Sequence, residues 1–234
     1  MPLGTQEVRW FLEGALAKTG AGVEAWFERR APLGAGGRVG ALEWAPAPPG
    51  WRDDRYLLVP GAADMGIKWR EGQLQIKGRH AALGARQFAE GIEGEVERWV
   101  KWSYAGRALR QRFKACFAPG SSGAPGPILV EKRRIQRTIR LDLSGAAVEV
   151  PAGEPCARAL SIELVRIRLA GRERHWTIGV EAFPGDAAMD EPFTAVVADF
   201  LRGCPALPLE RARSMSYPAW LARLEPESGA SGTL

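Results

Sequence analysis

The chain has 234 residues, of which 46% are hydrophobic and 25% charged, an ordinary composition for a globular protein. Its length suffices for one large domain or two small ones, and its formal net charge of +5 at pH 7 favours an anionic partner. The sequence has no apolar run long enough to cross a membrane and no signal-peptide core near its first residue, so neither membrane insertion nor secretion is expected.

Cysteine and histidine usage narrows the chemistry further. The three cysteines, Cys116, Cys156 and Cys204, are far apart and odd in number, so neither a disulfide framework nor a CxxC metal site is predicted. A reducing cytoplasm is therefore the expected location. Only two histidines occur, His80 and His175, which argues against a histidine-rich zinc site.

The N-terminal quarter of the sequence predicts two strands separated by a helix and a loop. In chain order, the predicted elements are a strand over residues 7–13, a helix over 19–30, a loop over 31–52 and a strand over 56–59. Side chains alternate across a strand, so Val8, Trp10 and Leu12 share the apolar face of the first one. Glu7 and Arg9 lie on its other face.

Residues 67–79 predict a β-hairpin with one basic face. Glu71 and Gly72 form the turn, because glycine supplies the positive φ that a two-residue hairpin loop needs. With this turn, one face of the hairpin carries Lys68, Arg70, Gln73, Gln75 and Lys77. This face has no acid, and like charges on neighbouring strands repel unless solvent or an anion lies over them.

The second half of the sequence predicts mainly strands. The predicted strands cover residues 94–104, 128–143, 160–169 and 176–183, the predicted helices cover residues 189–202 and 217–224, and residues 118–127 form a loop. Two of these strands add cations to their polar faces. Lys101 lies in the first of them, and Lys132 and Arg134 share one face of the second.

Eight or so strands with few helices predict an α+β fold that is mainly β. We expect a single antiparallel sheet, closed or nearly closed into a barrel with a few flanking helices. In a closed barrel the ionic faces of the strands would line the lumen, and a barrel of about eight strands can hold a small ligand. The barrel domain is expected to cover residues 1–224, and residues 225–234 are expected to be a disordered tail.

The recurrence of ionic strand faces favours a basic cavity, although one such hairpin alone would indicate a solvated sheet face. The candidate ligand-binding cations are Lys68, Arg70, Lys77, Lys101, Lys132 and Arg134. Glu7, Glu163 and Glu181 either pair with these cations or ligate a hard cation such as Mg²⁺ together with substrate phosphate oxygens. Because the cations alternate into a sheet face and do not form an external arm, a nucleic-acid partner is disfavoured.

Several short motifs follow one another in an order that is informative. They are EVRWF at residues 7–11, IKWR at 67–70, LQIK at 74–77, EKRR at 131–134, IELVR at 162–166, IGVEAF at 178–183 and SYPAWL at 216–221. This order resembles the CYTH superfamily, the triphosphate tunnel metalloenzymes, over most of residues 7–221. The family pattern has an ExExK strand, a basic hairpin, a KxR strand and an acidic hairpin. The resemblance implies an antiparallel barrel around a charged tunnel that takes a triphosphate.

The departures from the family pattern bear on metal binding. Family members hold a divalent cation, Mg²⁺ or Mn²⁺, between acids and substrate phosphates. In this chain Arg9 replaces the second acid of the first strand, Phe11 replaces its lysine, and Phe183 stands where the last hairpin has an acid. A guanidinium cannot ligate a cation, so Arg9 is expected to neutralise Glu7 or to bind phosphate itself.

Two functions from different classes are consistent with the sequence. The first is a divalent-metal-dependent triphosphatase, in which the cations cradle a triphosphate or polyphosphate and Glu7, Glu163 and Glu181 hold Mg²⁺ or Mn²⁺. The second is a catalytically inactive module of the same fold that binds a phosphate compound, another anion or a partner. The activities of the resembled family favour the first function, whereas the missing acids favour the second.

Overall fold

The computed structural model describes residues 3–13, 20–40, 42, 50–59, 61–106, 111, 127–142, 144–169, 172–204 and 207–224. The predicted tail at residues 225–234 and most of the predicted loop at residues 118–127 lie outside the described residues. Within the described part of the chain, no helix has the length and apolar character that a membrane span requires.

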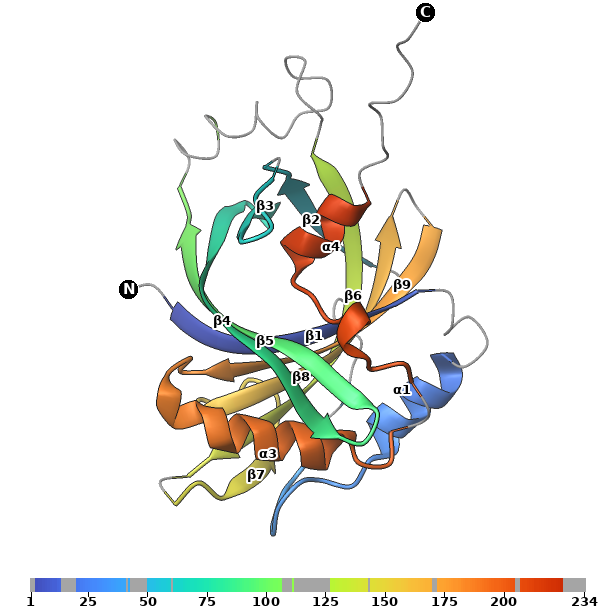
Figure 1. Ribbon diagram of the computed structural model, residues 1–234, viewed down its shortest axis with the longest axis vertical. Helices are drawn as coiled ribbons and strands as arrows, with labels where there is room; N and C mark the ends of the chain where they lie inside the picture. The colour runs from blue at the N-terminus through green and yellow to red at the C-terminus, as the bar shows by residue number, and fades with distance from the viewer. Residues whose placement is uncertain are drawn as a thin grey trace, which may run out of the picture.

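The described strands form one antiparallel sheet that closes on itself as a barrel (Figure 1). They are β1 (Leu3–Glu13), β2 (Arg52–Leu57), β3 (Met65–Arg70), β4 (Gln73–Ala89), β5 (Ile92–Tyr104), β6 (Ile128–Leu141), β7 (Ala147–Val150), β8 (Ala159–Leu169) and β9 (Arg172–Phe183). Their order is β2-β3-β4-β5-β1-β9-β8-β6-β7, and the pairing of β2 with β6 closes a ring of eight strands. The prediction of a mainly β, antiparallel barrel is confirmed, and β7 is an extra strand beside β6.

The basic hairpin has the predicted turn and register. Glu71 and Gly72 have φ angles of 47° and 79°, as expected for a two-residue loop that follows the twist of its strands. Lys68 lies opposite Gln75, so the register matches the one predicted from the turn. The basic side chains of the hairpin therefore share the inner face of the barrel.

Several strands differ from the sequence prediction, and β1 and β9 each begin four residues before their predicted starts at residues 7 and 176. β2 covers residues 52–57 and not 56–59, because its polar first half pairs with β6, and from Asp54 onward also with β3. β4 extends past the predicted hairpin to Ala89 and turns into β5 through Gly91, whose φ is 71°. β7 lacks a clear alternation in the sequence and is formed by pairing with the end of β6.

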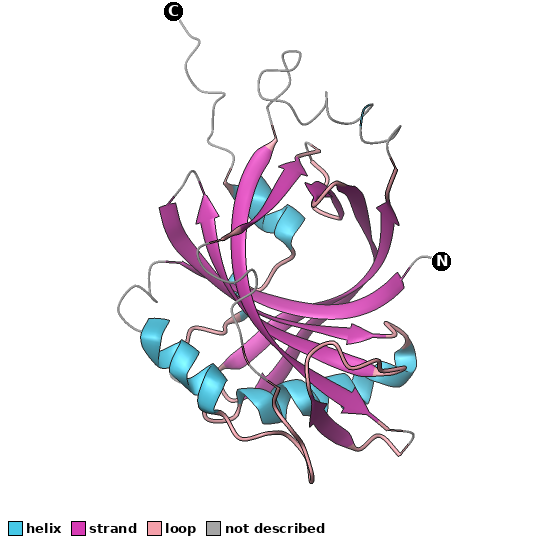
Figure 2. Cartoon of the chain, turned by 180° about the vertical axis from the view of Figure 1, so that it is seen from behind, coloured by secondary structure: helices cyan, strands magenta, loops and turns pink. Residues whose placement is uncertain are grey.

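Two helices pack on the outside of the barrel. They are α1 (Gly20–Arg29) and α3 (Asp190–Leu201), which lie below the ring in Figure 1 and again in Figure 2. Phe27 and Phe200 on these helices join Trp10, Ile135 and Leu164 from the outer strand faces in one buried cluster. Two 3₁₀ turns flank α3 in sequence: η2 (Ala187–Met189) directly precedes it, and η3 (Arg211–Arg213) follows it. Part of the apolar outer surface is thus covered by helices, whereas Trp102, Tyr104 and Leu129 on β5 and β6 stay exposed. The ionic faces are left inside.

A third helix, α4 (Tyr217–Arg223), packs at one end of the lumen. Its Trp220 stacks on Phe11 of β1 with ring centroids 4.5 Å apart, and Tyr217 stacks with Tyr56 of β2 at 6.0 Å. Phe11 shares its strand face with Glu7 and Arg9, so the same inner face is apolar near α4 and ionic farther along. This arrangement explains the aromatic residue at position 11.

A buried ion pair connects α1 to the sheet. Arg137 of β6 and Glu149 of β7 have fully buried side chains, and Nε–Oε1 and Nη2–Oε2 distances of 2.5 and 2.9 Å join them. Arg137 also donates to the carbonyl oxygens of Phe27 and Arg30 at the end of α1, and Glu149 accepts the N–H of Leu33. Each buried charge is therefore both paired and hydrogen-bonded, the condition under which such charges are tolerated.

We predict that Glu149→Gln lowers the free energy of unfolding by about 3–5 kcal/mol, because it leaves the Arg137 charge buried without a counter-charge. Chemical denaturation measures this loss. Glu154→Gln is the matched control, since Glu154 pairs with Arg140 at a partly exposed site and its loss should cost less than about 1 kcal/mol. Equal, small losses in the two variants would contradict the structural role of Arg137 and Glu149.

Candidate functional site

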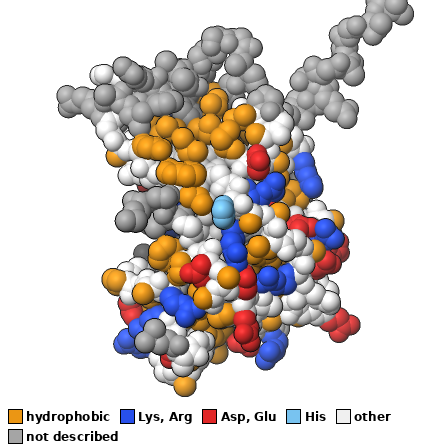
Figure 3. Space-filling view, turned by 60° about the vertical axis from the view of Figure 1, so that its left-hand side comes forward, with side chains coloured by type: hydrophobic (Ala, Val, Ile, Leu, Met, Phe, Trp, Pro, Cys, Tyr) orange, Lys and Arg blue, Asp and Glu red, His pale blue; other side chains and the backbone are white. Residues whose placement is uncertain are grey.

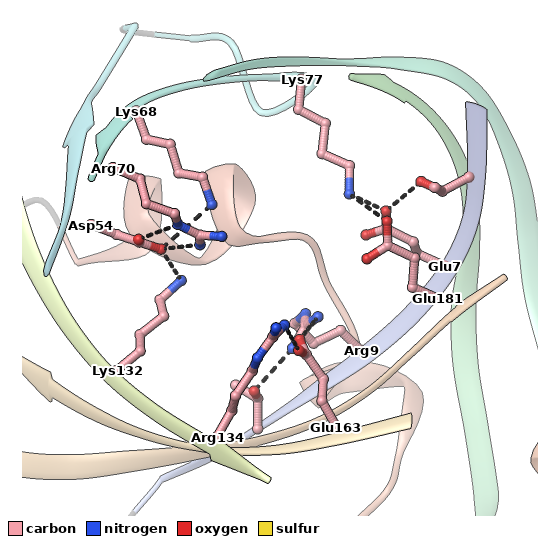
Figure 4. Close-up of polar contacts among 12 residues, drawn as sticks. Glu7, Arg9, Asp54, Lys68, Arg70, Lys77, Lys132, Arg134, Glu163 and Glu181 are labelled. Atoms are coloured by element: carbon pink, nitrogen blue, oxygen red, sulfur yellow. Dashed lines mark hydrogen bonds and ion pairs between the residues drawn. The ribbon is translucent and has the colours of Figure 1, made fainter. Parts of the chain in front are cut away.

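The lumen holds a cavity of about 150 Å³, enough for roughly ten water molecules. Its lining includes every site residue predicted from the sequence: Glu7, Arg9, Lys68, Arg70, Lys77, Lys101, Lys132, Arg134, Glu163 and Glu181. Eight basic and five acidic side chains line it in all. Figure 4 shows nine of them, all but Arg52, Lys101, Glu95 and Glu97, turning inward from the surrounding strands. The two predicted groups, cations and acids, therefore meet in one place.

Asp54 of β2 is the centre of the basic wall. Its carboxylate is fully buried and accepts two hydrogen bonds from Arg70, at 2.6 and 2.5 Å. The Nζ atoms of Lys68 and Lys132 lie 3.4 and 3.2 Å from its Oδ2 (Figure 4). Nε of Arg52 lies 3.6 Å from its Oδ1. One negative charge thus faces four positive charges, and the four cations line the cavity in front of it.

Crowding of cations shifts the pKa values around Asp54. Burial alone would raise the pKa of Asp54, but Lys132, Lys68 and Arg70 outweigh burial and hold that pKa well below its ordinary value. Burial and the nearby arginines lower the pKa of Lys68 to about 7, although Asp54 opposes them. The pKa of Lys132 also lies well below its ordinary value, chiefly because of burial. The charged forms of Lys68 and Lys132 are therefore disfavoured beside Asp54 unless a further anion lies near them.

Arg9 lies in a row of residues that crosses three strands. Its Cα is opposite Gly179 of β9, which in turn is opposite Glu163 of β8. Arg9 reaches over Gly179 to Glu163, with Nη2 2.5 Å from Oε1, and Nη1 donates to the hydroxyl of Thr177 at 3.0 Å. A Cβ at position 179 would lie 2.6 Å from the guanidinium, so glycine is what leaves room for Arg9. Glu163 also accepts from Arg134 at 3.3 Å, and it is shared by two arginines.

Glu7 and Glu181 face each other across β1 and β9 and share Lys77 of β4 (Figure 4). The Lys77 ammonium is ion-paired with Glu7 and lies 3.9 Å from Glu181, and the hydroxyl of Thr5 donates to Glu7 at 2.7 Å. Burial and the neighbouring Glu7 carboxylate raise the pKa of Glu181. Burial would also raise the pKa of Glu7, but the charge and hydrogen bond of Lys77 outweigh burial, so the pKa of Glu7 is lowered.

Three lining side chains are less committed to partners within the protein. Arg134 is 35% exposed and contacts Glu163 at 3.3 Å. Burial lowers the pKa of Lys101, although Glu181 opposes the shift. The Oε1 atom of Gln75 is buried against the cavity and accepts no hydrogen bond from any described residue. These side chains present two cations and one acceptor to a ligand.

The predicted metal ligands do not fit a preformed divalent-cation site. Glu163 is occupied by Arg9 and Arg134, while Glu7 and Glu181 flank the Lys77 ammonium. No group of three or more His, Cys, Asp or Glu side chains suited to a metal ion occurs within the described ranges. The Mg²⁺ or Mn²⁺ expected from the family resemblance therefore stays a prediction.

Asp54 and Arg52 were not predicted as site residues. The sequence around them, RDDRY at residues 52–56, alternates so that Arg52, Asp54 and Tyr56 share one face. A strand prediction that begins at Tyr56 overlooks this face. The signal that could have revealed Asp54 is the acid-free ladder of the hairpin, because such a ladder requires a counter-charge from another strand.

The arrangement as a whole is suited to holding an anion. Its cations converge from β1, β2, β3, β4, β5 and β6, and three of its acids, Glu7, Glu163 and Glu181, lie against these cations. Comparison with protein-family models and with curated proteins finds no match for this chain.

We predict that Asp54→Asn destabilises the protein by about 3–5 kcal/mol, because four cations lose their common counter-charge. Thermal and chemical unfolding measure the loss. Asp53→Asn is the control on the same strand, and its exposed position predicts a change within about 0.5 kcal/mol. A polyphosphate added to the Asp54 variant should restore stability by more than it adds to the wild type. Equal stability of the two variants would show that Asp54 does not hold the basic wall together.

Proposed function

We propose that the lumen binds a small polyanion, a triphosphate or another polyphosphate compound. The observation that carries this proposal is the imbalance at Asp54, where one buried carboxylate faces Arg52, Lys68, Arg70 and Lys132. Positive charges held this close without enough counter-charge are stabilised by an anion that lies over them. Arginine and lysine are also the side chains that bind phosphate oxygens most strongly.

The position of the cations supports a small ligand over a macromolecule. They point into a cavity of about 150 Å³, whereas a nucleic-acid strand needs a groove or surface that follows its backbone. On the face drawn in Figure 3, basic side chains are interspersed with acidic ones. The resemblance to the CYTH superfamily adds support for a triphosphate over other anions, and membership in that family is part of the proposal.

Metal-dependent hydrolysis of the bound triphosphate is the second candidate. Its supporting observation is the pair of facing carboxylates, Glu7 and Glu181, at the side of the cavity away from Asp54 (Figure 4). A divalent ion between them would have to displace the Lys77 ammonium, and Arg9 on the same strand would repel it. These two cations make binding without turnover the better-supported function.

We predict that tripolyphosphate raises the melting temperature of the protein, because a ligand bound to the native state alone stabilises it by mass action. Arg134→Gln combined with Lys101→Gln should weaken the affinity at least tenfold, since each charge-assisted hydrogen bond is worth about 1.5–3 kcal/mol. Isothermal titration calorimetry gives both dissociation constants.

Arg140→Gln is the matched control for this double variant, since Arg140 lies on β6 with Arg134 but pairs with Glu154 outside the cavity. It should bind tripolyphosphate as the wild type does. Citrate, an anion without phosphate, tests whether the site selects phosphate. An unchanged affinity in the double variant, or no binding by the wild type, would overturn the proposed site.

We predict that removing divalent metal leaves binding intact. Tripolyphosphate should bind with the same affinity in EDTA as in Mg²⁺ or Mn²⁺, corrected for the metal complex of the free ligand, because Lys77 and Arg9 supply the positive charge that a metal would bring. Phosphate release from tripolyphosphate, ATP and other triphosphates should stay at the background rate. Release that requires Mn²⁺ and is lost in Glu181→Gln would replace the binding function with the hydrolytic one.

A further inference from the structure

We propose that Lys68 is a nucleophilic amine which forms an imine with a small aldehyde or ketone that carries a phosphate. The proposal rests on the proposed function, because the phosphate is what brings the carbonyl compound into the lumen. The observation behind it is that the Nζ atoms of Lys68 and Lys132 lie within 3.4 and 3.2 Å of the same carboxylate oxygen, Oδ2 of Asp54. Two lysines that share one oxygen compete for its charge.

Asp54 cannot fully compensate Lys68. Its two oxygens already accept hydrogen bonds from Arg70 at 2.6 and 2.5 Å, and Arg52 lies 3.6 Å away. Several charged or titratable groups face Lys68. β2 contributes Arg52, Asp54 and Tyr56, and the neighbouring strands contribute Arg70 (β3), Lys101 (β5) and Lys132 (β6). Cations outnumber the single carboxylate in this set, which favours loss of a proton from a lysine.

The surroundings leave much of the Lys68 amine unprotonated at neutral pH. Its pKa of about 7 means that about half of it is the free base near pH 7, whereas an ordinary lysine is almost wholly protonated there. Only the unprotonated amine has the electron pair that attacks a carbonyl carbon.

Lys68 is a better candidate than Lys132 and Lys77, which also line the lumen. Lys132 is nearly fully buried, with 4% of its side chain exposed, and donates to the hydroxyl of Tyr56 at 2.8 Å. Lys77 is ion-paired with Glu7 and lies near Glu181, so it is held as an ammonium. Lys68 has 19% of its side chain exposed, and this surface faces the cavity. Lys77 is therefore an internal control in the same lumen.

The reaction needs no further reagent. The amine nitrogen of Lys68 attacks the carbonyl carbon, and one of its protons moves to the carbonyl oxygen to give a carbinolamine. The C–O bond then breaks and the hydroxyl leaves with the second nitrogen proton as water, so that a C=N bond remains. Amine and carbonyl compound thus give imine and water, with no net oxidation. The phosphate of the ligand lies against the surrounding cations, which places its carbonyl group near Lys68.

The test uses the full chain, glycolaldehyde phosphate as the probe and sodium cyanoborohydride to reduce the imine to a stable secondary amine. Intact mass and peptide mapping locate the adduct. We expect one adduct, on Lys68, at a probe concentration at least tenfold below that needed with glycolaldehyde, which lacks the phosphate. Tripolyphosphate should suppress labelling. The labelling rate should rise with pH through a midpoint near 7, well below the ordinary lysine pKa of 10.5.

Lys68→Arg keeps the positive charge but removes the amine, and it should abolish the adduct. Peptide mapping of the wild type gives the same assignment independently if this variant folds poorly. Labelling of Lys77 or of exposed lysines in preference to Lys68, or a midpoint near 10, would overturn the inference. Tripolyphosphate binding by the wild type is measured in parallel. Binding without a Lys68 adduct refutes the imine alone, whereas absence of both refutes the proposed function as well.

Discussion

The structure of the lumen depends on one constraint: a buried carboxylate, Asp54, must hold several cations that repel one another. Arg70 donates hydrogen bonds to both carboxylate oxygens of Asp54, and the ammonium groups of Lys68 and Lys132 both lie near Oδ2. These residues come from β2, β3 and β6, the strands whose pairing closes the barrel. The same interaction therefore joins the closing strands and leaves uncompensated positive charge facing the cavity. Closure of the fold and the proposed anion site thus depend on the same residues.

The division of the sheet into an apolar and an ionic face explains the rest of the architecture. The outer faces of β1, β6, β8 and β9 are buried under α1 and α3. On the inner face, Phe11 and Tyr56 pack against Trp220 and Tyr217 of the α4 segment, so the aromatic cluster limits the ionic part of the lumen. A barrel that buries this many charges can do so because each one has a hydrogen-bonded partner or borders the cavity.

Much of this could be predicted from the sequence, because alternation along a strand is a local property. The turn at Glu71 and Gly72 determines the hairpin register, and alternation then assigns Lys68 and Lys77 to one face. Which charges meet across the lumen is a property of the closed sheet, and here the sequence prediction missed Asp54 and Arg52. Asp54 lies in a polar segment whose strand is formed by pairing with β3 and β6, so no local apolar pattern marks it. β7 is another such case, since the ladder with β6 forms it.

In the first strand, Arg9 stands where the pattern of the resembled family has an acid, and this difference bears on what the cavity can hold. Arg9 reaches over Gly179 and neutralises the Glu163 carboxylate. The Lys77 ammonium neutralises the Glu7 carboxylate. Where the resembled family has acids that await a metal, this chain has acids that are already neutralised by its own cations. The positive charge that a metal would supply is thereby fixed to the protein, and it is present before any ligand arrives. Under the proposed function, an anion in the lumen would meet this charge without a metal, whereas a bound metal would add a Lewis acid that polarises a phosphoryl oxygen. The fixed cations therefore favour the proposed binding over turnover.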